Sequence, residues 1–238
     1  FGISAPQKIT FKRREKKKGI DQYERLDSTN ESLIIQEGPF SFKINTRDFL
    51  DTGLYLNHRP LRNIVYNQSS GKKLLNLFSY TSSMSLAAAL GGAKTTSVDL
   101  SNTYLNWSQD NFKLNDISLD SKEHNFIRES VPVYLKRAKE RGESFDLIYC
   151  DPPTFSNSKK MDSSFDVQEN HTSLIEGCMD LLNAGDQNAL YFSCHKKGFK
   201  LDLGLLQEKY KVLDITASSI PVDFRNKKIH FLFKIQHR

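Results

Sequence analysis

Short apolar runs alternate with stretches of helical periodicity over most of this chain. After residue 72 the order strand, helix, strand, helix recurs, and Gly91-Gly92 ends the first helix of this part. The predicted strands are 73–78, 95–100, 124–128, 145–150, 189–193, 210–217 and 229–235, and the helices are 82–90, 101–112, 165–183, 201–209 and one ending near 141. Strands that alternate with helices predict a mostly parallel sheet that is covered on both faces.

The end of the chain departs from this alternation. About a dozen residues without a helical period join the strands at 210–217 and 229–235, which favours an antiparallel closing strand. A seven-stranded α/β sheet that is parallel except for its last strand is the Rossmann-like architecture of S-adenosylmethionine-dependent methyltransferases. The pattern therefore predicts that fold class.

An appendage is expected before this sheet. Two alternating apolar runs, at 33–35 and 40–44, flank Gly38-Pro39 and predict a β-hairpin, and a helix is expected near 56–66. Residues 1–30 are basic and polar and are typical of an arm. We therefore expect a basic N-terminal arm with hairpin and helix over 1–70, and a methyltransferase domain over 71–238.

Composition narrows the class of partner. The formal net charge is +6, and the basic residues cluster, as in the run from Lys12 to Lys18, which favours a polyanionic partner such as nucleic acid. No apolar run approaches the ~20 residues of a membrane helix, and no secretory signal opens the chain. Three cysteines, at spacings that match no zinc or disulfide framework, fit a reducing cytoplasm and predict no metal site. Because the first residue is Phe1, we expect a piece of a longer protein.

The segment Asp151-Pro152-Pro153-Thr154-Phe155 is the strongest candidate for chemistry. It follows the predicted strand 145–150 directly, so the Asp151 carboxylate lies at the carboxyl edge of the sheet, where open α/β folds bind ligands. Two prolines fix φ and remove two N–H donors, although they also end strands in ordinary turns. We take Asp151, Pro152, Pro153 and Phe155 as the candidate catalytic residues.

A second feature predicts a cofactor site. The first strand of the sheet leads into the polar turn Phe78-Ser79-Tyr80-Thr81 and a helix N-terminus, which together make a nucleotide cradle. Asp99 ends the next strand, 23 residues after Asn76, where a carboxylate can accept ribose hydroxyls; capping of the following helix beside Ser101 is the alternative role. The turn lacks G-x-G-x-x-G, which argues against NAD, whereas a methyl donor has no phosphates to cradle.

Several strings resemble one family. LNLFSYT, DLSNTYLNW, DPPTFSNSK and FSCHKKGF, with DFLDTGLYLNHR and KGIDQYERL upstream, resemble the bacterial 23S ribosomal RNA guanine-N7 methyltransferase, the C-terminal half of the fused rRNA large subunit methyltransferase K/L. The resemblance runs from about Gln7 to Ile235. It implies S-adenosyl-L-methionine as cofactor, S-adenosyl-L-homocysteine as product, 23S rRNA or a ribosome assembly intermediate as partner, and a cytoplasmic location. It also implies a preceding half with a THUMP module and a guanine-N2 methyltransferase.

The resemblance extends the set of cofactor residues. The full set is Tyr55, His58, Arg59, Asn76, Phe78, Ser79, Tyr80, Thr81, Asp99, Ser130 and Asp151. The chain departs from the family pattern at three places. Asn57 stands where the family usually has Asp, Ser130 aligns with an acidic position and has Glu129 beside it, and Ser193-Cys194-His195 replaces an Asn-rich string.

Three functions are open at this point. Guanine N7 has a lone pair and no proton, so its methylation needs alignment rather than a base; Phe155 would stack on the guanine, and Asp151 would bind its edge. A 5-methylcytosine enzyme would instead use Cys194 as nucleophile, with a pKa lowered by His195, Lys196 and Lys197. A small, apolar-like structural role at a strand end is the favoured alternative for Cys194. A non-catalytic RNA-binding domain with a degenerate cofactor pocket is the third function, supported by Ser130.

Basic residues are expected to form a rim around the catalytic mouth. They follow predicted strands or precede the closing strand, so they should emerge at the edge that carries Asp151 and contact phosphates. These residues are Lys159, Lys160, Lys196, Lys197, Lys200, Arg225, Lys227 and Lys228.

Overall fold

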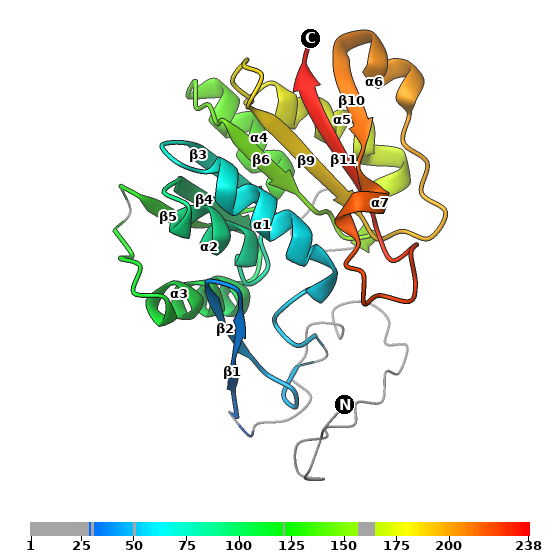
Figure 1. Cartoon of the computed structure of the whole chain (residues 1–238). Helices are drawn as coiled ribbons and strands as arrows, with labels where there is room; N and C mark the ends of the chain where they lie inside the picture. Colours follow the sequence, from blue (N-terminus) through cyan, green and yellow to red (C-terminus); the bar gives the residue numbers. More distant parts are fainter. Residues whose placement is uncertain (1–28, 30, 50, 121, 157–164) are drawn as a thin grey trace.

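The computed structural model describes residues 29, 31–49, 51–120, 122–156 and 165–238. The basic run from Lys12 to Lys18 and the predicted RNA contacts Lys159 and Lys160 lie outside these residues. The described chain folds as one sheet with helices on both faces and a small hairpin beside it (Figure 1).

The sheet has seven strands in the order β10-β11-β9-β6-β3-β4-β5. Its strands are β3 (Lys73–Leu77), β4 (Lys94–Asp99), β5 (His124–Arg128), β6 (Leu147–Cys150), β9 (Ala189–Cys194), β10 (Tyr210–Asp214) and β11 (Phe231–His237). Neighbours from β9 to β5 pair in parallel, and β11 is antiparallel to both β9 and β10. The predicted mostly parallel sheet with an antiparallel last strand is confirmed.

Alternating side chains of the strands fill two layers of core. One layer joins Leu75 and Ile148 to α4 (Val131–Glu140) and α5 (Val167–Met179). The other joins Leu74 and Leu147 to α1 (Arg59–Gln68) and α2 (Ser83–Leu90). Because successive residues of a strand point to opposite faces, these buried runs need helices on both sides.

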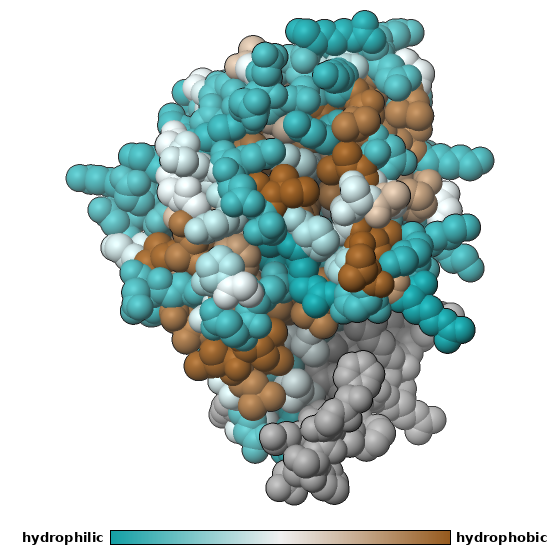
Figure 2. All heavy atoms as spheres, viewed as in Figure 1, coloured by the Kyte–Doolittle hydropathy of each residue, from teal (hydrophilic) through white to brown (hydrophobic). Residues whose placement is uncertain are grey.

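The expected hairpin is present as β1 (Leu33–Glu37) and β2 (Phe40–Ile44). It packs on α2 and on α3 (Asn102–Leu114), where Asn111 and Asn115 accept hydrogen bonds from the backbone of β2, from Lys43 at 2.9 Å and Ser41 at 2.8 Å. These amides satisfy an otherwise open strand edge. Apolar atoms gather over the hairpin (Figure 2), where Leu33 and Ile34 are 55% and 65% exposed.

Three details differ from the sequence predictions. The connection between β10 and β11 contains a short helix, α7 (Thr216–Ser219), which is too short to leave a period in the sequence. A two-stranded ribbon, β7 (Phe155–Ser156) and β8 (Phe165–Asp166), follows the double proline. The strand predicted at 145–150 begins at Leu147, because Phe145 makes only an isolated bridge to Leu182.

The helix expected near 56–66 is a 3-10 turn, η3 (Leu56–His58), followed by α1. Pro60 lies in the first turn of α1, where a backbone N–H finds no partner within the helix. Proline has no N–H, so this position suits it. α1 packs on α2 and the sheet, and the division of the chain at residue 70 stays a prediction. Within the described residues, no helix has the length and apolar character to cross a membrane.

Candidate active site

Asp151 lies where three distant segments of the chain meet. It follows β6, His195 follows the neighbouring strand β9, and His58 ends η3. The Nε2 atoms of His58 and His195 each lie 3.5 Å from Asp151 Oδ2, and the Tyr149 hydroxyl donates to the same oxygen at 3.1 Å. The other oxygen, Oδ1, is buried and has no hydrogen-bond partner among the described residues.

The surroundings of this cluster shift the pKa of each of its three groups. Burial alone would raise the pKa of Asp151, but the charges and hydrogen bonds of His195 and His58 outweigh it and hold that pKa well below its usual range. Burial opposes protonation of His195, yet Asp151 raises the pKa of that imidazole. Burial lowers the pKa of His58 despite Asp151. Asp151 is therefore an ionised carboxylate that lies against two imidazoles.

The double proline presents an aromatic ring beside this carboxylate. Pro152 is buried and Pro153 is half-buried, whereas the Phe155 side chain in β7 is 53% exposed. The start of α5 holds the residue before the ribbon, because the Val167 N–H donates to the Thr154 carbonyl at 3.3 Å. The structure thus places Asp151, Pro152, Pro153 and a half-exposed Phe155 side chain at one edge of the sheet.

The turn after β3 is strained. Phe78, Tyr80 and Ser82 have φ values of +54°, +52° and +55°, and each left-handed non-glycine residue costs about 1–2 kcal/mol. Gly53 holds this turn from the neighbouring loop, since its N–H donates to the Tyr80 hydroxyl at 2.8 Å and its carbonyl accepts from Thr81 Oγ1 at 2.7 Å. Strain that is held in this way is typical of functional sites.

Asp99 holds the turn after β3 and the residue that caps α3, while its predicted contact with the ribose stays a prediction. It ends β4, its Oδ2 accepts from the Tyr80 N–H at 2.9 Å, and its Oδ1 accepts from the Ser101 N–H at 2.8 Å. Burial raises its pKa against these backbone hydrogen bonds. Ser101 caps α3 as predicted, by accepting from the Tyr104 N–H. Each Asp99 oxygen keeps a second lone pair for a ligand.

Unsatisfied oxygens lie at the carboxyl ends of β3 and β6. Asn76 is 1% exposed and donates to Ser85 Oγ at 2.9 Å, while Asn76 Oδ1, Ser79 Oγ and Asp151 Oδ1 are buried without partners among the described residues. Because buried oxygens without donors are costly, this edge fits a ligand that carries N–H and O–H groups.

The remaining predicted cofactor residues surround this edge at different depths. Tyr55 is 40% exposed, and its ring centroid lies 5.4 Å from that of Tyr80 and 5.7 Å from that of His195. Arg59 points elsewhere, to an ion pair with Asp223. Ser130 is buried at the start of α4 and makes no side-chain cap. Neighbouring Glu129 is held by Arg137, with 2.8 Å between the charged atoms.

The state of Cys194 argues against the cytosine alternative. The thiol is completely buried at the end of β9, and burial raises its pKa to about 11. Lys196 lowers this pKa only in part, so the low pKa that the cytosine alternative requires is absent, and the favoured role of a buried structural cysteine agrees with the structure. A thiol with that pKa is almost fully protonated at neutral pH and is a poor nucleophile.

Two of the predicted basic segments reach the Asp151 edge. The loop 195–202 follows β9, and the loop 221–228 precedes β11, whose Phe231 pairs with Cys194. Lys197, Lys200, Arg225, Lys227 and Lys228 are exposed, whereas Lys196 is paired with Asp166 at 2.6 Å. Lys227 Nζ donates within its own loop, to the carbonyls of Pro221 and Val222 at 3.3 Å.

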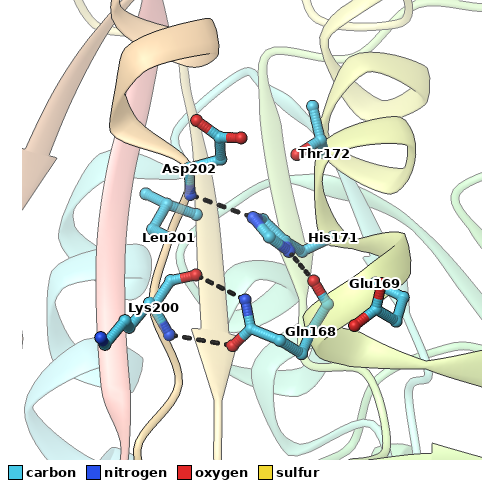
Figure 3. A pocket seen from close by; sticks show the side chains of 7 residues that line it. All are labelled: Gln168, Glu169, His171, Thr172, Lys200, Leu201 and Asp202. Atoms are coloured by element: carbon cyan, nitrogen blue, oxygen red, sulfur yellow. Dashed lines mark hydrogen bonds between the residues drawn. The ribbon is translucent and has the colours of Figure 1, made fainter.

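The first of these loops is clamped to α5 around a surface hollow of about 450 Å³ (Figure 3). The Gln168 side chain exchanges two hydrogen bonds with the backbone of Lys200, at 2.8 and 3.0 Å. His171 Nδ1 donates to the Gln168 carbonyl at 2.8 Å, so its Nε2 accepts from the Asp202 N–H at 3.1 Å. Gln168 and His171 of the hollow serve this clamp, so they support the loop.

Sequence reasoning missed His195, Tyr149 and Gly53 as parts of this site. Tyr149 lies two residues before Asp151, and His195 directly follows Cys194. The two side chains come together only because β6 and β9 pair. Gly53 lies inside the LDTGLYLNHR string. Its φ is +94°, and an added Cβ would lie 2.2 Å from Trp107 Cζ2, so only glycine fits.

The sheet order, the strained turn after its central strand and the acidic ends of β4 and β6 define a Rossmann-like methyltransferase. The chain belongs to the S-adenosylmethionine-dependent methyltransferases, whose family model matches residues 10–215. S-adenosylmethionine is therefore its cofactor, and the ribose hydroxyls and α-ammonium of that molecule are the kind of donors that the unsatisfied oxygens lack.

Named relatives agree with this family. The ribosomal RNA large subunit methyltransferase K of Neisseria meningitidis serogroup B is 47% identical over 235 residues, covering 98% of this chain and 65% of the relative. The ribosomal RNA large subunit methyltransferase K/L of Psychromonas ingrahamii is 49% identical over 226 residues, covering 94% of this chain and 29% of the relative. The chain thus spans just under two thirds of the first relative and less than a third of the second.

Solved structures agree in fold. The crystal structure of SMU.776 complexed with SAH has a TM-score of 0.72 at 26% identity, covering 88% of this chain and 57% of that chain. The SAM-dependent methyltransferase from Agrobacterium tumefaciens has a TM-score of 0.70 at 18% identity, covering 89% of this chain and 72% of that chain.

Proposed function

We propose that this chain transfers the methyl group of S-adenosylmethionine to N7 of a guanine in 23S rRNA. The observation that carries the proposal is the state of Asp151, an ionised carboxylate with a lowered pKa, one oxygen of which accepts from Tyr149 and lies 3.5 Å from two imidazole nitrogens. Such a group is a weak base but a good acceptor for N–H groups. Guanine N7 carries no proton, so its methylation is chemistry that needs an acceptor and alignment rather than a base.

Each residue has a role in this proposal. Asp99 and the turn 78–82 hold the adenosine part of the cofactor, which when bound supplies an electrophilic methyl group. Phe155 stacks on the guanine, which is worth about 1–3 kcal/mol per base. Asp151 Oδ1 accepts from the N–H edge of the base and offsets the positive charge that develops on the ring.

Cytosine C5 methylation is the alternative, and the state of Cys194 argues against it. A cytosine enzyme needs a thiolate, whereas burial raises the pKa of this thiol to about 11. We expect Cys194→Ala to retain methyl transfer to rRNA within a few-fold, as should the control Cys178→Ala, which removes another fully buried thiol. Asp151→Ala should lose at least a hundredfold. Loss of activity in Cys194→Ala alone would favour the cytosine enzyme.

The RNA-binding module without catalysis makes a different prediction for the cofactor. Its pocket would be degenerate around Ser130, so calorimetry with S-adenosylmethionine would give no heat at millimolar concentration. We expect binding instead. Retained cofactor binding with no methyl transfer to any rRNA would leave the catalytic proposal without support.

RNA is proposed to lie along the basic loops 195–202 and 221–228. Because Lys196 is already paired with Asp166, Lys197 should contribute more to phosphate binding. Lys197→Ala should reduce the slope of log K against log salt by about one. Lys211→Ala, which removes an exposed charge from β10, is the matched control and should leave the slope unchanged. An unchanged slope in Lys197→Ala would remove this loop from the interface.

The longer relatives support a partner region in the same protein. We propose that this chain follows a THUMP and guanine-N2 methyltransferase half in a cytoplasmic enzyme, since it spans less than a third of the K/L relative. Exposed Leu33 and Ile34 on the hairpin are suited to contact such a region. Mass spectrometry of the intact native protein would measure its length directly, and a mass near 27.3 kDa would contradict this proposal.

A further inference from the structure

We propose that His58, Asp151 and His195 bind a divalent transition metal ion of the zinc class, and that a bound ion inhibits methyl transfer. The two Nε2 atoms lie 3.2 Å apart, and each lies 3.5 Å from Asp151 Oδ2. In a triangle with these sides, the point equidistant from the corners is about 2 Å from each of them. Zinc binds imidazole nitrogen and carboxylate oxygen at about 2.0–2.2 Å.

The chemistry of the three ligands selects the class of ion. Two imidazoles and one carboxylate suit zinc, cobalt or nickel, whereas magnesium and calcium prefer all-oxygen sites. The three side chains come from positions 58, 151 and 195, so no spacing in the sequence reveals them. With only three protein ligands, the ion keeps an open position for water or another small ligand.

The surrounding groups limit the site to these three ligands. The His230 ring lies 4.8 Å from that of His58, but both of its nitrogens are engaged. Its Nδ1 accepts from Asn57 at 2.9 Å, which leaves Nε2–H to donate to Ser219 Oγ at 2.8 Å. The Tyr149 hydroxyl donates to Asp151 Oδ2 and is suited to orient that carboxylate as a second contact.

Binding exchanges an ion for a proton. The ion takes the Nε2 lone pairs of both imidazoles and one lone pair of Asp151 Oδ2, and any proton held on these Nε2 atoms leaves to solvent. The ion then lies at the edge where the base must approach. This inhibition rests on the proposed function, whereas the binding itself does not.

The direct test is calorimetric titration of the whole chelator-treated chain with zinc, with metal content measured after gel filtration. We expect one zinc ion per chain with a micromolar dissociation constant, and at least tenfold weaker binding in His195→Ala. His237→Gln is the matched control, because it removes a histidine at the opposite end of β11 and should bind like the parent chain. No binding at millimolar zinc, or equal binding by His195→Ala, would overturn the site.

Two further measurements keep the outcomes separate. Cobalt added to the unmodified chain should give the intense visible absorption of a four-coordinate ion, which zinc should remove; a spectrum identical to that of free cobalt would overturn the site without any variant. Zinc that binds with this stoichiometry and leaves methyl transfer unchanged would overturn the inhibition. Absence of methyl transfer without zinc would instead count against the proposed function.

Discussion

Replacement of Glu37 by alanine should destabilise the chain through a buried charge. Arg62 in α1 is 0% exposed, and Glu37 at the end of β1 accepts two hydrogen bonds from its guanidinium, at 2.7 and 2.6 Å. The third nitrogen group of Arg62 donates to the Tyr55 carbonyl at 3.0 Å. The pair therefore joins the hairpin, α1 and the loop that carries Tyr55 and His58.

The expected cost follows from what remains after the change. In Glu37→Ala the guanidinium stays buried, and the partners left to it among the described residues are the Tyr55 carbonyl and the Phe42 ring, 5.5 Å away. Breaking a buried pair in this way costs about 3–5 kcal/mol. Because the Glu37 side chain is 16% exposed and water can replace part of it, we expect the lower end, about 3 kcal/mol. For a chain of this length, that lowers Tm by about 6–12 °C.

Urea unfolding followed by circular dichroism measures this cost. The matched control is Glu31→Ala, which breaks the exposed pair with Arg47, whose charged atoms lie 3.2 Å apart. Exposed pairs are worth about 0–1 kcal/mol, so this variant should unfold close to the parent chain. A double variant that also carries Arg62→Met should recover part of the loss, since it removes the stranded charge. Equal, small effects of Glu37→Ala and Glu31→Ala would refute the reasoning.

Three other changes probe the turn and the histidines. Ser82→Gly should raise the free energy of unfolding, measured in urea, by about 1 kcal/mol. Ser82 has φ +55°, and its buried hydroxyl has no partner among the described residues. A lower free energy of unfolding would contradict this. Gly53→Ala should lower the free energy of unfolding by about 3 kcal/mol or more, because the added Cβ would clash with Trp107. The control Gly71→Ala has φ +70° and nothing within 4 Å of the added Cβ, so it should cost about 1–2 kcal/mol. Equal effects of the two changes would refute the clash. Burial lowers the pKa of His230 to about 3 from 6.5, so the unfolded chain binds more protons between these values and the free energy of unfolding should fall as pH falls from 6.5. His230→Asn should flatten that decline, and an unchanged slope would exclude His230 as its cause.

Much of the fold could be predicted because its signals are local. The buried runs of β3, β6 and β9 and the cap at Ser101 follow from side chains that are neighbours in the sequence. The antiparallel last strand followed from the length of the connection before it. By contrast, α7 is four residues long and leaves no period, and the ribbon β7–β8 pairs only two residues of each strand.

The candidate site was predictable in outline and not in its contacts. Asp151 and Asp99 could be placed because residues at strand ends share one edge of a parallel sheet. The contacts of Asp151 with His58 and His195 could not, because they depend on how the loop before α1 crosses that edge. The same limit applies to Cys194, since neighbouring cations in the sequence suggested a low pKa while complete burial raises it to about 11.

The most direct test of the central proposal is to map the methyl group that this chain adds to unmodified 23S rRNA in the presence of S-adenosylmethionine. Borohydride and aniline cleave RNA at 7-methylguanine, and mass spectrometry of the fragments identifies the modified nucleotide. We predict cleavage at a guanine that carries one added methyl group. A methylated product that resists cleavage, with the methyl group on a cytosine or on guanine N2, would contradict the account.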